Sequence, residues 1–374
     1  MDFTLGPELQ EVSALSARIF TDLAQPHRLR EVESEGGFDD ALWRTLGEAD
    51  LIGLTLPESI GGAGLGLLGL VAVLEQQGRR VAPVPLWSAV TQAALPLAES
   101  GSTEQKARWL PDLLTGAAVV TGSFDLDLEH RPTLSAMRDG DRLVVSGVLA
   151  SVPAAPIAVA YVVPLTTPDG TRVAVVPADR AGITVRPYSA TNWESNASVA
   201  FDGVRLAPAD LMPADGGTVV DRVRTRARIA LAALATGVCE EAVTITAAYT
   251  SQRTQFGRPL STNQAVALRA ADAHLDTERI RLTTCKAAWH ADRDEEDAAR
   301  AASLVAKWWA ATGGLRAVHA TQHLHGGIGA DVDYPIHRYF LWGRQIAFSL
   351  GSAGAAEAEL GDLLDRAPAI GAPA

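Results

Sequence analysis

Gln252-Arg253-Thr254-Gln255-Phe256-Gly257-Arg258-Pro259-Leu260 is a short break between two long helical patterns. Upstream, residues 226–250 contain no proline, and apolar side chains recur there at three- and four-residue steps. This is the period of a helix with one buried face. The glycine and proline of the break predict the end of one helix, and Ser261 or Thr262 is expected to cap the next. Downstream, the helical pattern continues at Leu268, Ala271, Leu275, Leu282, Cys285 and Trp289.

Arg253 and Gln255 are therefore expected at a helix end. The planar fork of a guanidinium group suits a phosphate or pyrophosphate. Taken alone, the stretch is more typical of a capped helical hairpin with a surface arginine. A second signal is needed to choose between a ligand contact and a plain turn.

That second signal is a glycine-rich run further downstream, Gln322-His323-Leu324-His325-Gly326-Gly327-Ile328-Gly329, which follows another helical pattern. Three glycines in four positions let a backbone approach a ligand closely. Arg-x-Gln-Phe-Gly, then Gln264, then His-Gly-Gly-Ile-Gly, then Tyr334-Pro335-Ile336-His337-Arg338, in this order, resemble the C-terminal domain of the acyl-CoA dehydrogenase family.

The resemblance implies that these elements hold the adenosine and pyrophosphate part of FAD, largely across a subunit interface. His323 stands where the family usually has a glutamine, and its ring N–H can still donate. The cofactor-binding residues implied in this way are Arg253, Gln255, Phe256, Gln264, His323, Gly326, Gly327 and Ser352.

Composition narrows the class of protein. The 374 residues carry a formal charge of −12 with a pI near 5.1, which argues against nucleic acid or an anionic membrane surface as the main partner. Cys239 and Cys285 both fall on apolar helix stripes and are expected to be buried free thiols. No metal site is predicted. No stretch is judged long and apolar enough to cross a bilayer, so the protein is expected to be cytoplasmic.

An α+β fold with three domains is predicted. Residues 1–118 are rich in helical patterns, residues 119–217 change to short β-rich runs, and residues 218–374 return to helices. The resemblance implies an N-terminal helical domain, a middle β-barrel or sandwich, and a C-terminal four-helix bundle. The β-rich runs are 143–145, 158–163, 172–176, 183–185 and 198–201.

The catalytic carboxylate of the family is missing from both of its usual places. The family removes the α-proton of a thioester with a Glu, which must lie within hydrogen-bond reach of that carbon. Reading forward from Pro335 without a gap puts Leu350 at the commoner Glu position, followed by Gly351 and Ser352. In the same register, Ala227 occupies the second position.

Other features of a complete active site are also absent. Leu341-Trp342 replaces the family's Arg-Asp pair, Gly147-Val148-Leu149 lacks the usual lysine, and little remains of the flavin-cradling loop at residues 120–129. Four glutamates nearby in sequence are interpreted as solvated helix charges, because a misplacement of about 1 Å already slows catalysis strongly. They are Glu240, Glu241, Glu357 and Glu359.

The preferred hypothesis is a non-catalytic subunit of a hetero-oligomeric acyl-CoA dehydrogenase. The chain resembles the base-lacking subunit of the α₂β₂ enzymes that desaturate CoA esters of steroid side chains. The resemblance implies that a homologous partner supplies the base and binds most of the acyl-CoA, and that this chain alone is inactive. Two alternatives stay open: a homo-oligomeric FAD enzyme with a relocated base or different flavin chemistry, and a structural or regulatory relic without flavin.

Overall fold

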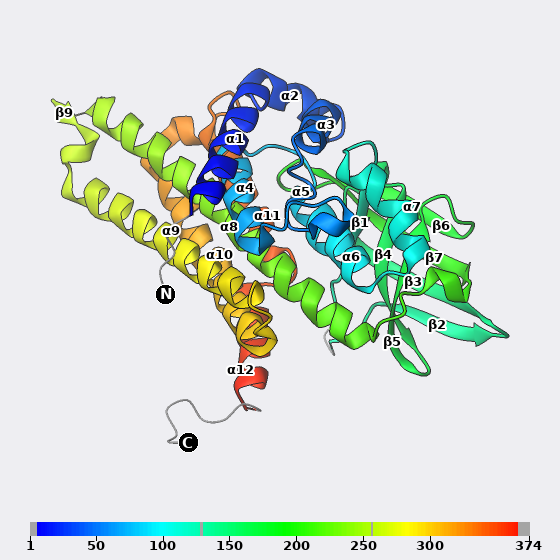
Figure 1. Ribbon diagram of the computed structural model, residues 1–374. Coiled ribbons are helices and arrows are strands. Elements are labelled where there is room, and N and C mark those ends of the chain that lie inside the picture. Colours follow the sequence, from blue (N-terminus) through cyan, green and yellow to red (C-terminus); the bar gives the residue numbers. More distant parts are fainter. Residues whose placement is uncertain (1–5, 128–129, 256, 366–374) are drawn as a thin grey trace. The chain divides into compact units, whose positions relative to one another are not determined.

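The computed structural model describes residues 6–127, 130–255 and 257–365 (Figure 1). The chain forms two compact units. One consists of the residues up to Ser13, Val71–Val81 and the chain from Arg228 onward; the other consists of Ala14–Leu70 and Ala82–Ala227. Helices α1, α4 and α8 contribute residues to both units. The predicted domain borders near residues 118 and 217 stay a prediction.

The N-terminal part is helical, as predicted. Asp39 caps α3 by accepting a hydrogen bond from the backbone N–H of Leu42 at 3.2 Å, and Ser102 and Gln105 form a reciprocal capping box at the start of α7. A π-helical turn, Val90–Ala94, joins α5 to α6. The helices are α1 (Pro7–Leu23), α2 (Pro26–Ser34), α3 (Asp40–Glu48), α4 (Gly66–Arg80), α5 (Leu86–Ala89), α6 (Leu95–Ser100) and α7 (Thr103–Leu114).

Within the described residues, the middle of the chain forms one mixed, seven-stranded sheet. The order is β1-β4-β2-β3-β7-β6, with β5 paired to β4; β1 and β2 run parallel to β4, and the other pairs are antiparallel. Four of the five predicted β-rich runs lie within β3, β5, β6 and β7, and the run 158–163 overlaps β4, which begins at Ala160. The strands are β1 (Val120–Gly122), β2 (Leu134–Asp139), β3 (Arg142–Pro153), β4 (Ala160–Thr167), β5 (Gly170–Pro177), β6 (Ile183–Ser189) and β7 (Ser195–Leu206).

The C-terminal part is again helical, which confirms the predicted fold class. Helix α10 packs against α9, α11 and α12, and a small hairpin of β8 (Thr254–Gln255) and β9 (Arg258–Pro259) stands at the tip between α8 and α9 (Figure 1). The helices are α8 (Gly216–Gln252), α9 (Gln264–Ala291), α10 (Glu296–Leu324), α11 (Ile336–Phe348) and α12 (Ala353–Asp365).

Cys239 and Cys285 are buried and free, as predicted. Burial raises the pKa of the Cys239 thiol to about 12 and that of Cys285 to about 11, so both thiols stay protonated near neutrality.

The expectation about apolar length is corrected for one helix. Helix α8 is long and apolar enough to cross a bilayer, but 72% of its most apolar window is buried inside the protein. The expectation that no stretch is long and apolar enough is therefore wrong for α8. High burial is typical of a core helix of a soluble protein.

Helices α4 and α8 touch backbone to backbone through two glycines. A Cβ added at Gly237 would lie 2.0 Å from the carbonyl oxygen of Glu75, and one added at Gly78 would lie 2.3 Å from the carbonyl oxygen of Leu234. Real Cβ atoms do not approach this closely, so only glycine permits this helix spacing.

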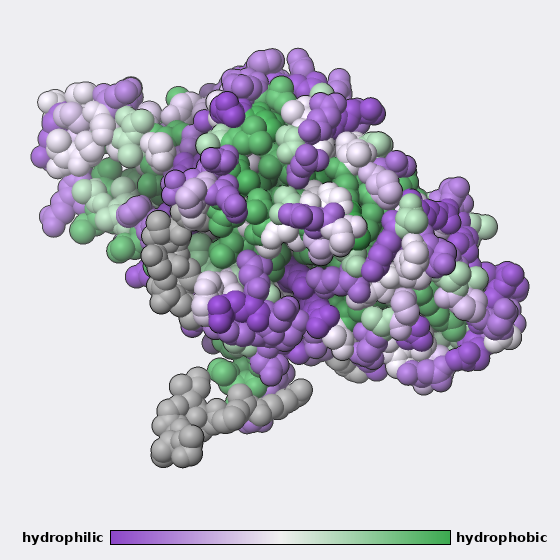
Figure 2. All heavy atoms as spheres, viewed as in Figure 1, coloured by the Kyte–Doolittle hydropathy of each residue, from purple (hydrophilic) through white to green (hydrophobic). Residues whose placement is uncertain are grey.

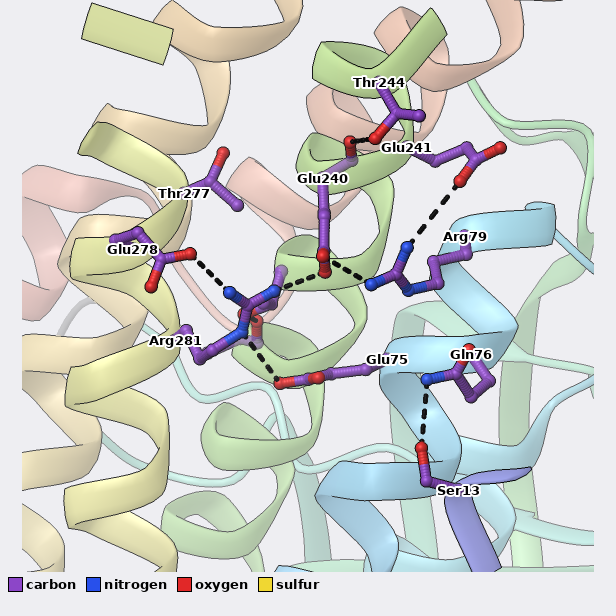
Figure 3. Close-up of polar contacts among 12 residues, drawn as sticks. Ser13, Glu75, Gln76, Arg79, Glu240, Glu241, Thr244, Thr277, Glu278 and Arg281 are labelled. Carbon is purple, nitrogen blue, oxygen red and sulfur yellow. Dashed lines mark hydrogen bonds and ion pairs between the residues drawn. The ribbon is translucent and has the colours of Figure 1, made fainter. Parts of the chain in front are cut away.

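A network of charged side chains surrounds this contact (Figure 3). Arg281 of α9 pairs with Glu240 and Glu278, and its Nε lies 3.8 Å from a carboxylate oxygen of Glu75. Arg79 of α4 pairs with Glu240 and continues the chain of contacts to α8. The network is therefore shared by three helices.

The C-terminal side of the network involves Glu241. Its carboxylate lies 3.8 Å from Arg79 and 3.4 Å from Arg80. The side chains of Glu240 and Glu241 are only 27% and 15% exposed. Their interpretation as solvated helix charges is wrong, because Arg79 and Arg80 of α4 and Arg281 of α9 pair with them.

Glu75 is the weakest-paired acid of the network. Three guanidinium groups, from Arg79, Arg80 and Arg281, face the four carboxylates of Glu75, Glu240, Glu241 and Glu278, so one carboxylate lacks a matching cation. Burial raises the pKa of Glu75 to about 7, although Arg281 opposes the shift.

We expect Gly237→Ala to lower the free energy of unfolding by about 1–3 kcal/mol, because the new methyl group collides with the α4 backbone. Gly361→Ala is the matched control: it lies in α12 with nothing within 4 Å of an added Cβ and should stabilise by about 0.5–1 kcal/mol through helix propensity. Denaturant unfolding of both variants measures these two changes in the free energy of unfolding, which should have opposite signs. Equal stability of Gly237→Ala and the parent chain would contradict the close contact.

The raised pKa of Glu75 predicts a pH dependence of stability. Between pH 4.5 and 7 the unfolded chain loses this proton while the folded chain keeps it, so stability falls as the pH rises. Glu75→Gln removes this loss. Its stability relative to the parent chain should therefore rise by on the order of 2 kcal/mol between pH 5 and pH 8.

Denaturant midpoints measured at both pH values test this expectation. Glu357→Gln, at an exposed position on α12, serves as the control. Its free energy of unfolding should change between pH 5 and pH 8 by the same amount as that of the parent chain. A Glu75→Gln variant with the same pH profile as the parent chain would rule out a protonated Glu75.

Candidate functional site

The β8–β9 hairpin presents the first set of predicted cofactor residues. The backbone N–H of Arg253 donates to the carbonyl of Tyr249 at 2.8 Å, and that of Leu260 donates to the carbonyl of Arg253 at 2.9 Å. These bonds hold the hairpin to the last turn of α8. Arg253 and Gln255 are exposed, at a helix end as predicted. Phe256 lies outside the described residues.

The cap of helix α9 lies one residue after the later of the two predicted cap residues. Asn263 caps it, because its side-chain oxygen accepts from the N–H of Ala265 at 3.0 Å. The prediction of Ser261 or Thr262 is wrong: the Thr262 hydroxyl instead donates to the carbonyl of Pro259 at 2.7 Å, inside the preceding 3₁₀ turn. Gln264 is the first residue of α9 and is exposed.

The glycine-rich run follows the end of α10 and forms a 3₁₀ turn, Gly326–Ala330. Gly326 has a left-handed backbone with φ of +63°, and a Cβ added at Gly326 or Gly327 would meet nothing within 4 Å. Gly329 differs, because its Cβ would lie 2.5 Å from the carbonyl oxygen of Gln322. Gly329 is needed for packing within the turn, whereas Gly326 and Gly327 leave open space for another molecule.

His323 lies on the exposed side of α10, beside α9. Its Nδ1 is 2.7 Å from Nη1 of Arg269. A guanidinium group only donates, so Nδ1 accepts and the neutral ring carries its proton on Nε2. His323 also lines a pocket of about 600 Å³ between α9 and α10. Its other lining residues are Arg269, Asp272, Ala273, Asp276, Arg279, Arg316, His319 and Ala320.

Most charges in this pocket are already paired with one another. Arg316 donates to both carboxylate oxygens of Asp276 at 2.9 and 2.7 Å, and Arg279 donates to the same carboxylate at 2.8 Å. The side chain of Asp276 is only 4% exposed. The pocket wall is therefore a rigid polar surface that spans both helices.

A partly buried aromatic cluster, with His325 at its centre, lies between the hairpin and the glycine-rich run. The ring of His325 stacks on Tyr249 with centroids 4.5 Å apart, and it is tilted against Tyr334 at 5.3 Å. Tyr249 and His325 were not among the predicted site residues. The signal available in the sequence was an aromatic residue in the last turn before Arg253 and a second histidine two positions after His323.

The two residues that the sequence analysis places at the family's catalytic Glu positions have buried apolar side chains. Leu350 is 8% exposed and has a left-handed backbone with φ of +54°, and Ala227 is fully buried within α8. Just before Leu350, the buried ammonium group of Lys307 donates to the carbonyls of Ile346 and Ala347 at 3.0 and 2.9 Å. These bonds anchor the end of α11 and the turn that follows.

Ser352 caps α12. Its Oγ accepts from the N–H of Ala355 at 3.3 Å, and its carbonyl accepts from the N–H of Ala356 at 3.0 Å. The predicted contact between this hydroxyl and a flavin stays a prediction, as do the other cofactor contacts.

Of the two glutamates on α12, only one fits the earlier interpretation. Glu357 is exposed, whereas the Glu359 side chain is 11% exposed and pairs with Arg228, itself 2% exposed. Arg300 lies 3.6 Å from the other carboxylate oxygen of Glu359. The interpretation of Glu359 as a solvated charge is wrong, because α8 and α10 each supply a guanidinium to it.

The described residues suit the nucleotide part of FAD better than they suit a metal ion. Open backbone at Gly326 and Gly327, an exposed guanidinium at Arg253 and an exposed amide at Gln264 match an anionic nucleotide. In the described ranges, 6–127, 130–255 and 257–365, no group of three His, Cys, Asp or Glu side chains lies in a metal-binding arrangement.

Comparisons with known proteins agree on one family. Residues 7–117 match the acyl-CoA dehydrogenase N-terminal domain, and residues 214–364 match the acyl-CoA dehydrogenase C-terminal domain. Among characterised relatives, acyl-CoA dehydrogenase FadE27 of Mycobacterium tuberculosis is 34% identical, and the alignment covers 99% of this chain and 100% of that protein.

Two solved structures with clear sequence identity are similar over nearly the full length. A variant of the Tcur3481-Tcur3483 steroid ACAD is 44% identical with a TM-score of 0.90, covering 97% of this chain and 99% of that one. The ChsE4-ChsE5 complex from Mycobacterium tuberculosis is 34% identical with a TM-score of 0.93, covering 99% and 100%.

Proposed function

This chain belongs to the acyl-CoA dehydrogenase family, and we propose that it is a non-catalytic subunit that completes the FAD site of a homologous, catalytic partner. The observation that carries the proposal is the buried, apolar character of Leu350 and Ala227, the two positions where the family places its base. Acyl-CoA dehydrogenases are FAD-dependent oxidoreductases, so the complex is proposed to desaturate an acyl-CoA thioester between its α- and β-carbons.

The chemistry needs a carboxylate that this chain does not offer at either position. When bound, FAD supplies the acceptor for the β-hydride, while a base must take the α-proton from the opposite side. Glu359 is the buried carboxylate closest in sequence after Leu350, and it is held by Arg228 and Arg300. A carboxylate engaged by two guanidinium groups is not available to accept a substrate proton. The base is therefore proposed to come from the partner.

The nucleotide-binding half of the site is proposed to be retained. Arg253 would donate to the pyrophosphate, and Gln255 and Gln264 would donate through their side-chain amides. The exposed Nε2–H of His323 would provide a further donor, and Gly326 and Gly327 would let the ligand contact the backbone. In the part of the chain that the structure describes, no side-chain hydrogen bond or ion pair engages Arg253 or Gln264, which leaves both available to a ligand.

The substrate class is proposed from the relatives. The structure with 44% identity is described as a steroid ACAD, and both similar structures are complexes of two differently named chains. By this likeness, the substrate is a CoA ester of a steroid side chain, bound mainly by the partner, in an α₂β₂ assembly that functions in the cytoplasm.

An apolar stripe on α9 fits an interface with such a partner. Leu268, Leu275 and Leu282 recur every seven residues and are 59%, 49% and 53% exposed. A seven-residue repeat of apolar side chains is the seam on which another helix packs. Figure 2 shows apolar surface along the arm of α8 and α9 that ends in the β8–β9 hairpin. We propose that a helix of the homologous subunit covers this stripe.

The proposal is tested by purifying the chain alone and together with a homologous acyl-CoA dehydrogenase chain that carries the Glu. The lone chain should hold little flavin and show no dehydrogenase activity, and the complex should be yellow and active. Flavin absorbance per chain and turnover with a steroid CoA ester are the measurements. Stoichiometric FAD and turnover in the lone chain would instead support a homo-oligomeric enzyme.

Within the complex, Arg253→Ala should weaken FAD binding about 10- to 100-fold, because one charge-assisted pair contributes about 1.5–3 kcal/mol. Arg258→Ala, on the same exposed hairpin, is the matched control and should retain FAD. The measurement is a flavin titration of the deflavinated complex. An intact complex in which Arg253→Ala leaves the affinity unchanged would favour a relic without a flavin role.

Leu275→Asp should weaken assembly with the partner at least tenfold, about 1.4 kcal/mol, because it buries a charge in the middle of the apolar seam. Leu364→Asp replaces a leucine on α12 that is 43% exposed and should leave assembly intact. Analytical ultracentrifugation of each variant mixed with the partner subunit measures how much of it is assembled. Normal assembly of Leu275→Asp would place the interface elsewhere.

A further inference from the structure

His325 joins two parts of the chain that are far apart in sequence. Its main-chain carbonyl accepts a hydrogen bond from the Tyr249 hydroxyl at 3.4 Å, and its ring stacks on Tyr249 with an interplanar angle of 27°. The Tyr249 carbonyl in turn accepts from the backbone N–H of Arg253 at 2.8 Å. On the other side, Gly326 follows His325 directly. Tyr249 and His325 therefore form a chain of direct contacts that leads from the hairpin at Arg253 to Gly326 and Gly327.

The hydrogen bond of the ring shows which of its two nitrogens carries the proton in the neutral form. Nδ1 lies 2.8 Å from the carbonyl oxygen of Thr321. Because a carbonyl oxygen only accepts, Nδ1 carries the proton and donates, and the neutral ring has its lone pair on Nε2. His325 is 3% exposed, and burial lowers its pKa. Burial therefore favours the neutral ring, although the Thr321 carbonyl opposes the shift, and the bond to Thr321 and the neighbouring tyrosine rings fix its orientation.

Space-filling alone does not account for a histidine at this position. Its Nε2 is buried without a hydrogen-bond partner in the described structure, and an unpaired buried acceptor is unfavourable for stability. A phenylalanine would stack on Tyr249 and Tyr334 without that penalty. What histidine adds is the Nδ1–H donor to Thr321, which ties the ring and the following glycine-rich turn to the last turn of α10.

We propose that His325 is a positioning residue that sets the spacing between Arg253 and the Gly326–Gly327 backbone, so that one nucleotide can contact both at once. This inference rests on the proposed nucleotide-binding function. A ligand that needs two contacts binds more tightly when both are already in place, because less conformational freedom is lost on binding. Here the hairpin is exposed, and the Tyr249–His325 contact connects it to the glycine-rich run.

The test uses the deflavinated complex with the homologous catalytic chain and measures the FAD dissociation constant by flavin fluorescence. His325→Phe keeps a stacking ring and removes the Nδ1–H donor. It should weaken FAD binding about tenfold. In the double variant with Arg253→Ala, FAD binding should be at most about twofold weaker than in Arg253→Ala alone, because His325 acts by placing Arg253.

A second variant covers the case in which His325→Phe does not fold. Tyr249→Phe retains the ring and removes only the hydroxyl that donates to the His325 carbonyl. It should weaken FAD binding about threefold and should also be non-additive with Arg253→Ala. The thermal midpoint of each deflavinated complex is recorded alongside, because a merely structural defect would lower that midpoint without non-additivity in FAD affinity.

The outcomes separate the two proposals. An Arg253→Ala variant that binds FAD normally contradicts the proposed function itself. An Arg253→Ala variant that binds weakly, combined with His325→Phe and Tyr249→Phe variants that bind normally, overturns only the role of His325. The role of His325 is also overturned if the losses of FAD binding free energy in His325→Phe and Arg253→Ala add in full in the double variant, because independent contacts are additive.

Discussion

The backbone contact between α4 and α8 is the constraint on which the C-terminal unit depends. Gly78 and Gly237 let the two helices approach to a distance that no side chain permits. This approach brings Arg79 and Arg80 of α4 within reach of the acids on α8 and α9 (Figure 3). The charged network is thus a consequence of helix spacing. Helix α8 ends at Gln252, just after Tyr249 and just before Arg253. The position of the β8–β9 hairpin therefore depends on helix packing that lies several turns away.

The site combines retained and lost features in a way that is physically consistent with a shared active site. Ligand contacts by exposed side chains and open glycines need only a stable scaffold, and α8, α9 and α10 provide one. Proton abstraction needs a carboxylate at one position, and a single apolar residue there removes it. The proposed loss of the base at Leu350 is therefore compatible with an intact fold and an intact β8–β9 hairpin. This is why the family membership of the chain and its proposed lack of catalytic activity are compatible.

Much of the fold follows from sequence periodicity, whereas the contacts between distant segments do not. Helix ends near Gln252 and Leu324 and the five longer β-rich runs were predictable from glycine, proline and apolar spacing. The cap at Asn263 was missed because three consecutive residues were all able to cap, and only the backbone shows which one does. Glu240, Glu241 and Glu359 were misjudged because their partners, Arg79, Arg80, Arg228 and Arg300, lie on helices whose neighbours cannot be deduced from a single sequence. His325 was overlooked for the same reason.

The turn at Leu350 has a consequence for the side chain at that position. Leu350 has a φ of +54°, in the left-handed region that non-glycine residues adopt at a cost in free energy, least for Asn, Asp and His. Lys307 anchors the preceding helix end independently of that side chain. The side chain at position 350 can therefore be exchanged without loosening the turn, because the end of α11 is held through backbone carbonyls and not through Leu350 itself.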